Sequence, residues 1–350
     1  MSELIQKNDN RNTIRWKLLT GASALALTVS FNVAKAEDSS QPTIWIEADG
    51  QFARQDANTE AFLPPFLYSS QFDGLSQINR KAPSVWDEGG KISFQPEDTD
   101  WVLSAGIRFG KASRHASQIQ ITAQGTPGYG VNFTAYQDFS SSSIEGHTIV
   151  DFQVGKDVGL GKFGSGGHSL LGLGVRFAQF NSKSNISIHS QPTNVVRTHY
   201  RYYASFAADR KFRGLGPSLS WDASANIAGN GQDGSISLDW GVNGAVLFGR
   251  QQARVHRQVM EKHTFITFSR YIQHIDPVYT HSASPDRSKS VAVPNLGAFA
   301  GVSWRTPNAK VNFGYRADMF FGTIDGGIDA AKKENRSFNG PYASISIGLP

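Results

Sequence analysis

The sequence predicts an all-β fold, a transmembrane antiparallel up-and-down β-barrel of about twelve strands with short periplasmic turns and long extracellular loops. Three observations predict it. Segments of about ten residues alternate between apolar and polar side chains, which is typical of strands that face lipid on one side. Short turns alternate with long polar connections along the chain. An export signal precedes the first of these segments.

Residues 1–36 have the features of that signal, and residues 37–350 would form the barrel. Arg11, Arg15 and Lys17 make a basic flank, and residues 18–33 are mildly apolar. Ala34-Lys35-Ala36 then supplies the small residues that signal peptidase requires. The alternatives are a soluble amphipathic helix or a membrane anchor, but polar residues interrupt the apolar run. We therefore expect cleavage after Ala36.

Composition excludes several classes of protein. The chain has 350 residues, no cysteine and 35 glycines, and 18% of its residues are charged, which is too polar for a helical membrane protein. Removing residues 1–36 leaves 34 − 5 = 29 basic and 29 − 2 = 27 acidic side chains, a net charge of +2. No basic tract remains, so nucleic acid is not an expected partner.

The strand over residues 310–321 shows the alternating pattern most clearly. Val311, Phe313 and Tyr315 would face lipid, whereas Asn312 and Arg316 would face the interior. Equivalent segments precede and follow it, with turns predicted at 212–217 and 230–234. The predicted strands are, in order, 44–53, 91–95, 101–109, 148–154, 171–177, 200–208, 219–227, 236–248, 252–260, 296–304, 310–321 and 343–349.

The lengths of the connections support a membrane barrel independently. Residues 55–88, 112–144 and 262–293 are predicted loops, and they all fall on one side of the membrane if the strands alternate in direction. Bacterial outer-membrane barrels have short periplasmic turns and longer outer loops. A soluble β-sandwich, the alternative, gives no reason for loops to be sorted in this way.

Several runs resemble the pore-forming major outer-membrane protein family of the Legionella type, in its proteobacterial version. These are 93–96 with 100–105, 147–156, 216–221, and 311–318 with 326–329. The resemblance covers most of residues 37–350 and implies a porin-like barrel, with surface exposure in the better-known members. The chain departs from the usual aromatic C-terminus of such barrels, because it ends Gly348-Leu349-Pro350.

Charged residues on the polar faces are the candidate site. Gly-x-Arg occurs on three separate strands, and acidic side chains lie on the same faces. One interpretation is that each arginine pairs with an inward acid and fills a narrow interior; the other is that these residues line a pore. Both interpretations stay open from the sequence alone. The candidate pore-lining residues are Arg108, Arg176, Arg316, Asp318, Asp239, Asp222, Asp151 and Glu47.

Motifs for catalysis, cofactors or metals are weak. The run 159–164 fits G-x-G-x-x-G but lacks the strand–helix setting that binds dinucleotides. His256, His263, His274 and His281 are isolated histidines. A barrel lipase would need a serine, a histidine and an acidic or amide partner together, and His147, Ser169 and Ser224 are candidates that no spacing singles out. We expect no catalytic, cofactor-binding or metal-binding residue, no cofactor and no enzymatic activity.

The function that the sequence favours is a porin-like channel for passive diffusion of small hydrophilic solutes or ions. The alternative is a surface-exposed barrel with a closed lumen that acts as an adhesin or a structural outer-membrane protein. The expected partners are outer-membrane lipid, such solutes and, in a homo-oligomer, further copies of the chain.

Overall fold

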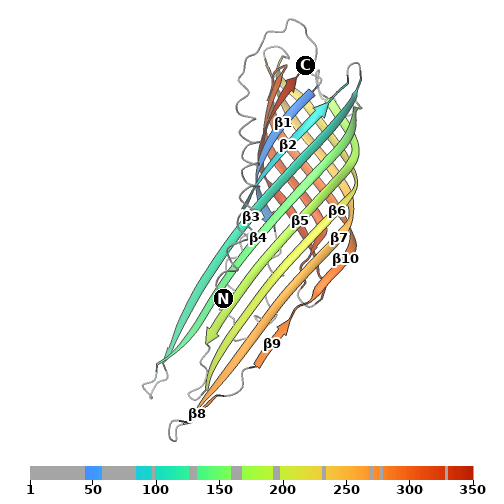
Figure 1. Cartoon of the computed structure of the whole chain (residues 1–350). Coiled ribbons are helices and arrows are strands. Elements are labelled where there is room, and N and C mark those ends of the chain that lie inside the picture. Colours follow the sequence, from blue (N-terminus) through green and yellow to red (C-terminus); the bar gives the residue numbers. More distant parts are fainter. Residues whose placement is uncertain are drawn as a thin grey trace, which may run out of the picture. The chain divides into compact units, whose positions relative to one another are not determined.

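A computed structural model of the chain gives the fold (Figure 1). It describes residues 44–56, 84–96, 99–125, 132–158, 168–191, 198–230, 234–267, 272–275, 279–327 and 330–349. The predicted signal peptide and the run 159–164 lie outside these residues. Nearly all the described residues are in strands, and among them no helix is long and apolar enough to cross a membrane.

Twelve strands form one antiparallel sheet. They are β1 (Ile44–Asp56), β2 (Ser84–Phe94), β3 (Trp101–Gly125), β4 (Asn132–Asp157), β5 (His168–Gln191), β6 (Thr198–Asn230), β7 (Gly234–Thr267), β8 (Ile272–Ile275), β9 (Tyr279–Ala283), β10 (Asp286–Arg305), β11 (Ala309–Asp325) and β12 (Lys333–Leu349).

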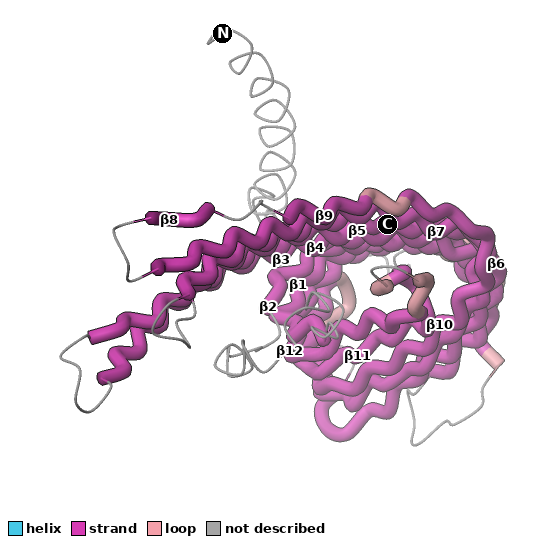
Figure 2. Tube along the Cα trace, turned by 90° about the horizontal axis from the view of Figure 1, so that it is seen from below, coloured by secondary structure: helices cyan, strands magenta, loops and turns pink. Residues whose placement is uncertain are grey.

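Ten of these strands close into a barrel (Figure 2). Strands β1 to β7 pair in sequence order, from β1 with β2 to β6 with β7. The ring then continues from β7 to β10, β11 and β12, and β12 pairs with β1 to close it. Closure pairs the edge strands that an open sheet would leave free, which is the condition for a sheet to cross a bilayer. The short strands β8 and β9 lie outside the ring, and among the described residues they pair with β7 alone. The predicted all-β barrel is therefore confirmed.

The ring has ten strands because two predicted boundaries are absent. The predicted strands 200–208 and 219–227 are both parts of β6, and 236–248 and 252–260 are both parts of β7. The predicted turn at 212–217 is continuous strand. Pro217 cannot donate to a neighbour, and the ladder between β6 and β7 is interrupted at Gly216 and Pro217 without a change of register. The predicted hairpin turn at 230–234 is confirmed, since Asn230 pairs with Gly234.

Much of what reads as long loop in the sequence is strand that continues beyond the membrane. A strand of about 9–11 residues crosses a bilayer, but β6 has 33 residues and β7 has 34. Residues 112–125 and 132–144 pair with each other as the outer parts of β3 and β4. We call the parts of β3 to β7 that continue past the barrel the outer sheet (Figure 1).

The barrel is apolar outside and polar inside, as the alternation predicts. Leu173 and Phe313 are both 65% exposed, and Leu103 is also exposed. On the opposite faces of the same strands, Gly172 and Asn312 are buried. Since apolar surface of this extent around a closed barrel requires lipid as its solvent, the chain is a bacterial outer-membrane β-barrel.

Candidate functional site in the barrel interior

Inward-facing side chains fill the barrel in three layers. We name them, from the end with the short turns outwards, the charged layer, the aromatic layer and the outer charged layer. The order is the same on the strands that contribute to all three. On β5 it runs Arg176, Phe180 and then Ser182, whose hydroxyl donates a hydrogen bond to Glu145 of the outer charged layer. On β11 it runs Asp318, Phe320 and then Asp325, which lies beside the outer charged layer.

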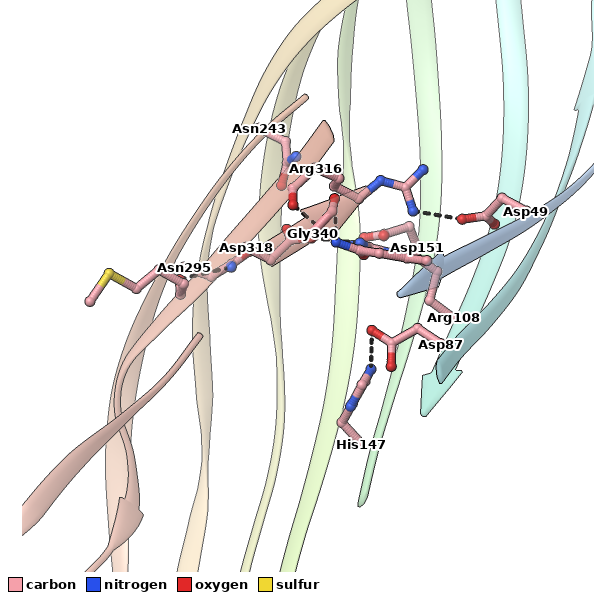
Figure 3. Close-up of polar contacts among 12 residues, drawn as sticks. Asp49, Asp87, Arg108, His147, Asp151, Asn243, Asn295, Arg316, Asp318 and Gly340 are labelled. Atoms are coloured by element: carbon pink, nitrogen blue, oxygen red, sulfur yellow. Dashed lines mark hydrogen bonds and ion pairs between the residues drawn. The ribbon is translucent and has the colours of Figure 1, made fainter. Parts of the chain in front are cut away.

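The charged layer joins three arginines to three aspartates. Figure 3 labels two of these arginines, Arg108 and Arg316, and all three aspartates. Arg176 lies directly opposite Asp151 on the neighbouring strand and donates two hydrogen bonds to its carboxylate, of 2.6 and 3.1 Å. Arg108 donates to Asp318 across the interior, from β3 to β11, over 2.6 Å. Charge-assisted and bidentate bonds of this kind are strong and fix the geometry of both partners.

The remaining pairs of this layer connect further strands. Arg316 of β11 donates to Asp49 of β1 over 2.6 Å, and its guanidinium lies 4.6 Å from the ring centre of Tyr342. Arg176 also donates to the side-chain oxygens of Asn243, over 2.8 Å, and Asn295. The three predicted arginines are therefore all bound to acids within the barrel.

The other predicted interior residues lie on the same inner surface. Lys310 makes an ion pair of 2.6 Å with Asp239, which is buried. Glu47 accepts a hydrogen bond of 3.1 Å from Ser346. Asp222 lies opposite Gly241 in the pairing of β6 with β7. The structure thus brings the predicted residues onto one interior surface and arranges most of them as pairs rather than as free charges.

The aromatic layer lies directly outside these pairs and consists of His147, Phe180, Phe212, Phe320 and Phe338. The ring centres of Phe180 and Phe320 are 4.8 Å apart, although β5 and β11 are separated by three strands on the shorter path around the ring. His147 and Phe338 approach to 4.1 Å between ring centres. These contacts join opposite walls, so the rings occupy the middle of the lumen.

This layer is closely packed. Phe212 and Phe320 have no exposed surface, and Phe180 and Phe338 are each 2% exposed. Ile149, Leu247 and Val293 belong to the same buried cluster. His147 is held beside the rings by Asp87, with 3.5 Å between Nε2 and Oδ2. In this cross-section, side chains from facing strands touch one another.

The outer charged layer contains Glu145, Arg210, Glu334 and Arg336, all buried. Arg336 lies 3.6 Å from Glu145 and 3.7 Å from Glu334. Burial raises the pKa of Glu334 above its usual value, because the nearby Arg336 and Arg210 only partly compensate for lost hydration.

The pKa of Asp325, which lies beside this layer, is shifted in the opposite direction. Burial acts to raise the pKa of Asp325, but a hydrogen bond from Arg287 and the backbone N–H groups of Lys332 and Gly327 outweigh it. The pKa of this carboxyl is therefore lowered. The Arg287 Nε to Asp325 Oδ2 distance is 3.0 Å.

The candidate lipase residues are not brought together. His147 lies level with Phe180 on β5, whereas Ser169 lies eleven residues nearer the inner end of that strand, about 36 Å at 3.3 Å per residue. Ser169 Oγ accepts a hydrogen bond of 2.9 Å from Trp221 Nε1. Over the described residues, no group of three or more His, Asp or Glu side chains is arranged to hold a metal ion. His256 bonds Ser284 on the exposed surface, and the side chains of His263, His274 and His281 are outside the described part.

The aromatic layer was not predicted, although the sequence contains a signal for it. Phe180 is in phase with Gly172 and Arg176, and Phe320 is in phase with Asn312 and Asp318. A large apolar residue in the polar phase of a barrel strand must point inwards. Two such residues in the outer halves of their strands indicate an apolar layer inside the barrel.

Comparison with known proteins adds similarity of fold alone. No protein-family model and no curated protein matches the chain. Among solved structures, the outer membrane protease OmpT from Escherichia coli is 11% identical, with 88% of this chain and 94% of that chain covered and a TM-score of 0.37. The transport unit of the autotransporter AIDA-I from Escherichia coli is 10% identical (94% and 97% covered, TM-score 0.31). Neisserial surface protein A is 9% identical (89% and 99% covered, TM-score 0.25).

Proposed function

We propose that this protein is a closed-lumen barrel that holds the outer sheet at the cell surface as a binding or structural platform. The observation that carries the proposal is the aromatic layer, in which rings from β4, β5, β11 and β12 meet across the lumen. A diffusion channel needs a continuous polar path, and this layer interrupts it. Membership of the Legionella-type porin-like family is part of the proposal, although the closed lumen departs from the porin-like barrel that this resemblance implies.

The outer sheet has the properties of a rigid platform. One of its faces carries a second buried apolar cluster that includes Phe139, Ile186, Ile188 and Phe206. The opposite face carries polar groups such as Ser187 and Lys183. Apolar packing on one face stiffens a sheet that the bilayer does not support, and the polar face remains available to partners in water.

The porin-like channel remains the second candidate because the charged layer keeps some contact with water. The side chains of Arg108, Asp151 and Lys310 are 19%, 21% and 25% exposed. Solutes that passed this layer would still have to displace the aromatic rings.

Conductance of the refolded protein in a planar bilayer tests the proposal. We expect no stepwise current from the wild type. The Phe180→Ala/Phe338→Ala variant removes two rings from the lumen and should conduct if it inserts. Phe313→Ala removes a ring of the same size from the lipid-facing surface and should stay silent.

Stepwise ohmic current from the wild type would contradict the closed lumen and favour the channel. Each buried Phe→Ala change costs about 3–5 kcal/mol, so folding of the double variant must be checked by heat-dependent electrophoretic mobility. The wild-type measurement decides the question even if that variant fails to fold.

A further inference from the structure

Two arginines lie directly opposite each other at the upper edge of the apolar surface. On the outward face of β6 and β7, Leu215 pairs with Phe248, and these side chains are 55% and 62% exposed. The next outward-facing pair, two residues further from the membrane, is Arg213 with Arg250, and both are exposed. The change from apolar to basic therefore occurs at the same height on both strands.

This arrangement of like charges is unfavourable by itself. Directly opposed residues on antiparallel strands have Cβ atoms about 4.5–5.5 Å apart, and like charges at that spacing destabilise a sheet. The partners of these arginines are neutral. Arg213 donates to Gln179 over 2.9 Å and Arg250 to Ser288 over 2.6 Å.

The nearby acids on this surface are already paired with other bases. Asp209 pairs with Lys211 at 3.2 Å and with Lys183 at 3.9 Å. Asp286 pairs with Arg254 at 3.0 Å. Among the residues that the structure describes, no acid forms an ion pair with Arg213 or Arg250.

An apolar hollow lies beside the pair. It is shallow and widely open to its surroundings, and it is lined by Phe248, Gly249, Arg250, Ser290, Val291 and Ala292. Its apolar walls continue the lipid-facing surface, and Arg250 stands at its polar edge. A molecule with an anionic head and a hydrocarbon chain matches both parts.

We propose that Arg213 and Arg250 together bind the phosphate of an anionic lipid of the outer leaflet, with its acyl chain on Leu215, Phe248 and the hollow. Guanidinium groups suit phosphate because their N–H groups match its oxygens in pairs. A bound phosphate converts the repulsion between the arginines into two attractions. The site depends on the outward face of the barrel and not on whether the lumen is closed.

The test compares the refolded protein in vesicles of phosphatidylcholine and in vesicles that also contain phosphatidylglycerol. The measurement is the melting temperature of the β-structure by circular dichroism. The anionic lipid should raise the melting temperature of the wild type, and Arg213→Gln/Arg250→Gln should lose most of that rise. In phosphatidylcholine alone the variant should melt no lower than the wild type, because it has lost a repulsion.

A matched control separates a site from general attraction of positive charge to anionic lipid. Arg54→Gln/Lys333→Gln removes the same charge from outward-facing positions of β1 and β12 that are not paired with each other. It should keep the rise seen in the wild type. Native mass spectrometry should show phosphatidylglycerol retained by the wild type and by the control, with at least tenfold less on the double variant.

Three results would overturn the proposal. These are an equal rise in wild type and double variant, an equal loss in the control, and full reproduction of the effect by inorganic phosphate without lipid. The last would show a free-anion site in place of a lipid site.

Discussion

At the scale of single residues, pairing explains how so many charges are held inside a narrow barrel. An isolated buried charge is costly, whereas a hydrogen-bonded pair recovers much of the lost hydration. Arg176 illustrates this, because it is 2% exposed and binds Asp151, Asn243 and Asn295 together. Each such bond joins different strands and so fixes their relative positions.

Asp325 gives a test of this pairing outside the membrane. Its lowered pKa means that the folded protein favours the carboxylate, so this group stabilises the fold above the unfolded value of 3.8 and loses that effect as the pH falls through the folded pKa. Asp325→Asn should therefore lower the midpoint of denaturation at pH 7. The difference from wild type should shrink below pH 3.8. A difference that stays constant down to low pH would contradict the ion pair with Arg287.

At the scale of elements, the long strands β6 and β7 depend on close approach of their backbones. A Cβ at Gly216 would overlap the carbonyl oxygen of Val246, whereas a Cβ at Gly244 would meet Leu296 and Asn295 only at 3.5 and 3.6 Å. The close approach of the two backbones therefore requires a glycine at position 216 but not at position 244, although the sequence shows both simply as glycine in a strand.

Alanine substitution distinguishes them. Gly216→Ala should separate β6 from β7 locally and lower the yield of heat-modifiable, folded barrel. Gly244→Ala should fold like the wild type, because its side chain enters space at ordinary contact distance. Equal yields from the two variants would show that the backbones are not so close at Gly216.

At the scale of the whole molecule, the barrel presents apolar side chains to lipid on its outer surface and polar side chains to its interior. Its stability depends on this distribution. Leu173 is directed to lipid, and Ser104, on the inward phase of β3, is only partly buried near the inner end of the barrel. An arginine near the membrane midplane costs about 2–4 kcal/mol on the lipid face.

Leu173→Arg should therefore impair insertion into vesicles, whereas Ser104→Arg should insert nearly as well as the wild type. The fraction of protein that resists unfolding in unboiled electrophoresis measures the difference. Equal insertion of the two variants would mean that the lipid-facing surface has been assigned wrongly.

The period-two alternation in the sequence determined the fold class and the face of the side chains in the segments that cross the bilayer, because lipid outside and polar groups inside impose it there. It did not determine where strands end. Beyond the bilayer both faces of a strand meet water or other protein, so the outer parts of β3, β4 and β5 read as loops although backbone pairing continues. The outer parts of β6 and β7 keep an alternation and are predicted as separate strands, 200–208 and 252–260, but their apolar face is buried in protein and does not meet lipid.

Only the tertiary structure decided which side chains contact one another inside the barrel. Phe180 and Phe320 are 140 residues apart in the chain, and no local pattern states that their rings meet at 4.8 Å. The pairing of Arg108 with Asp318 depends in the same way on ring closure at ten strands, which sets the width of the lumen. Alternation selects a face for each residue, but contact across a barrel depends on strand number and register, which are properties of the closed sheet.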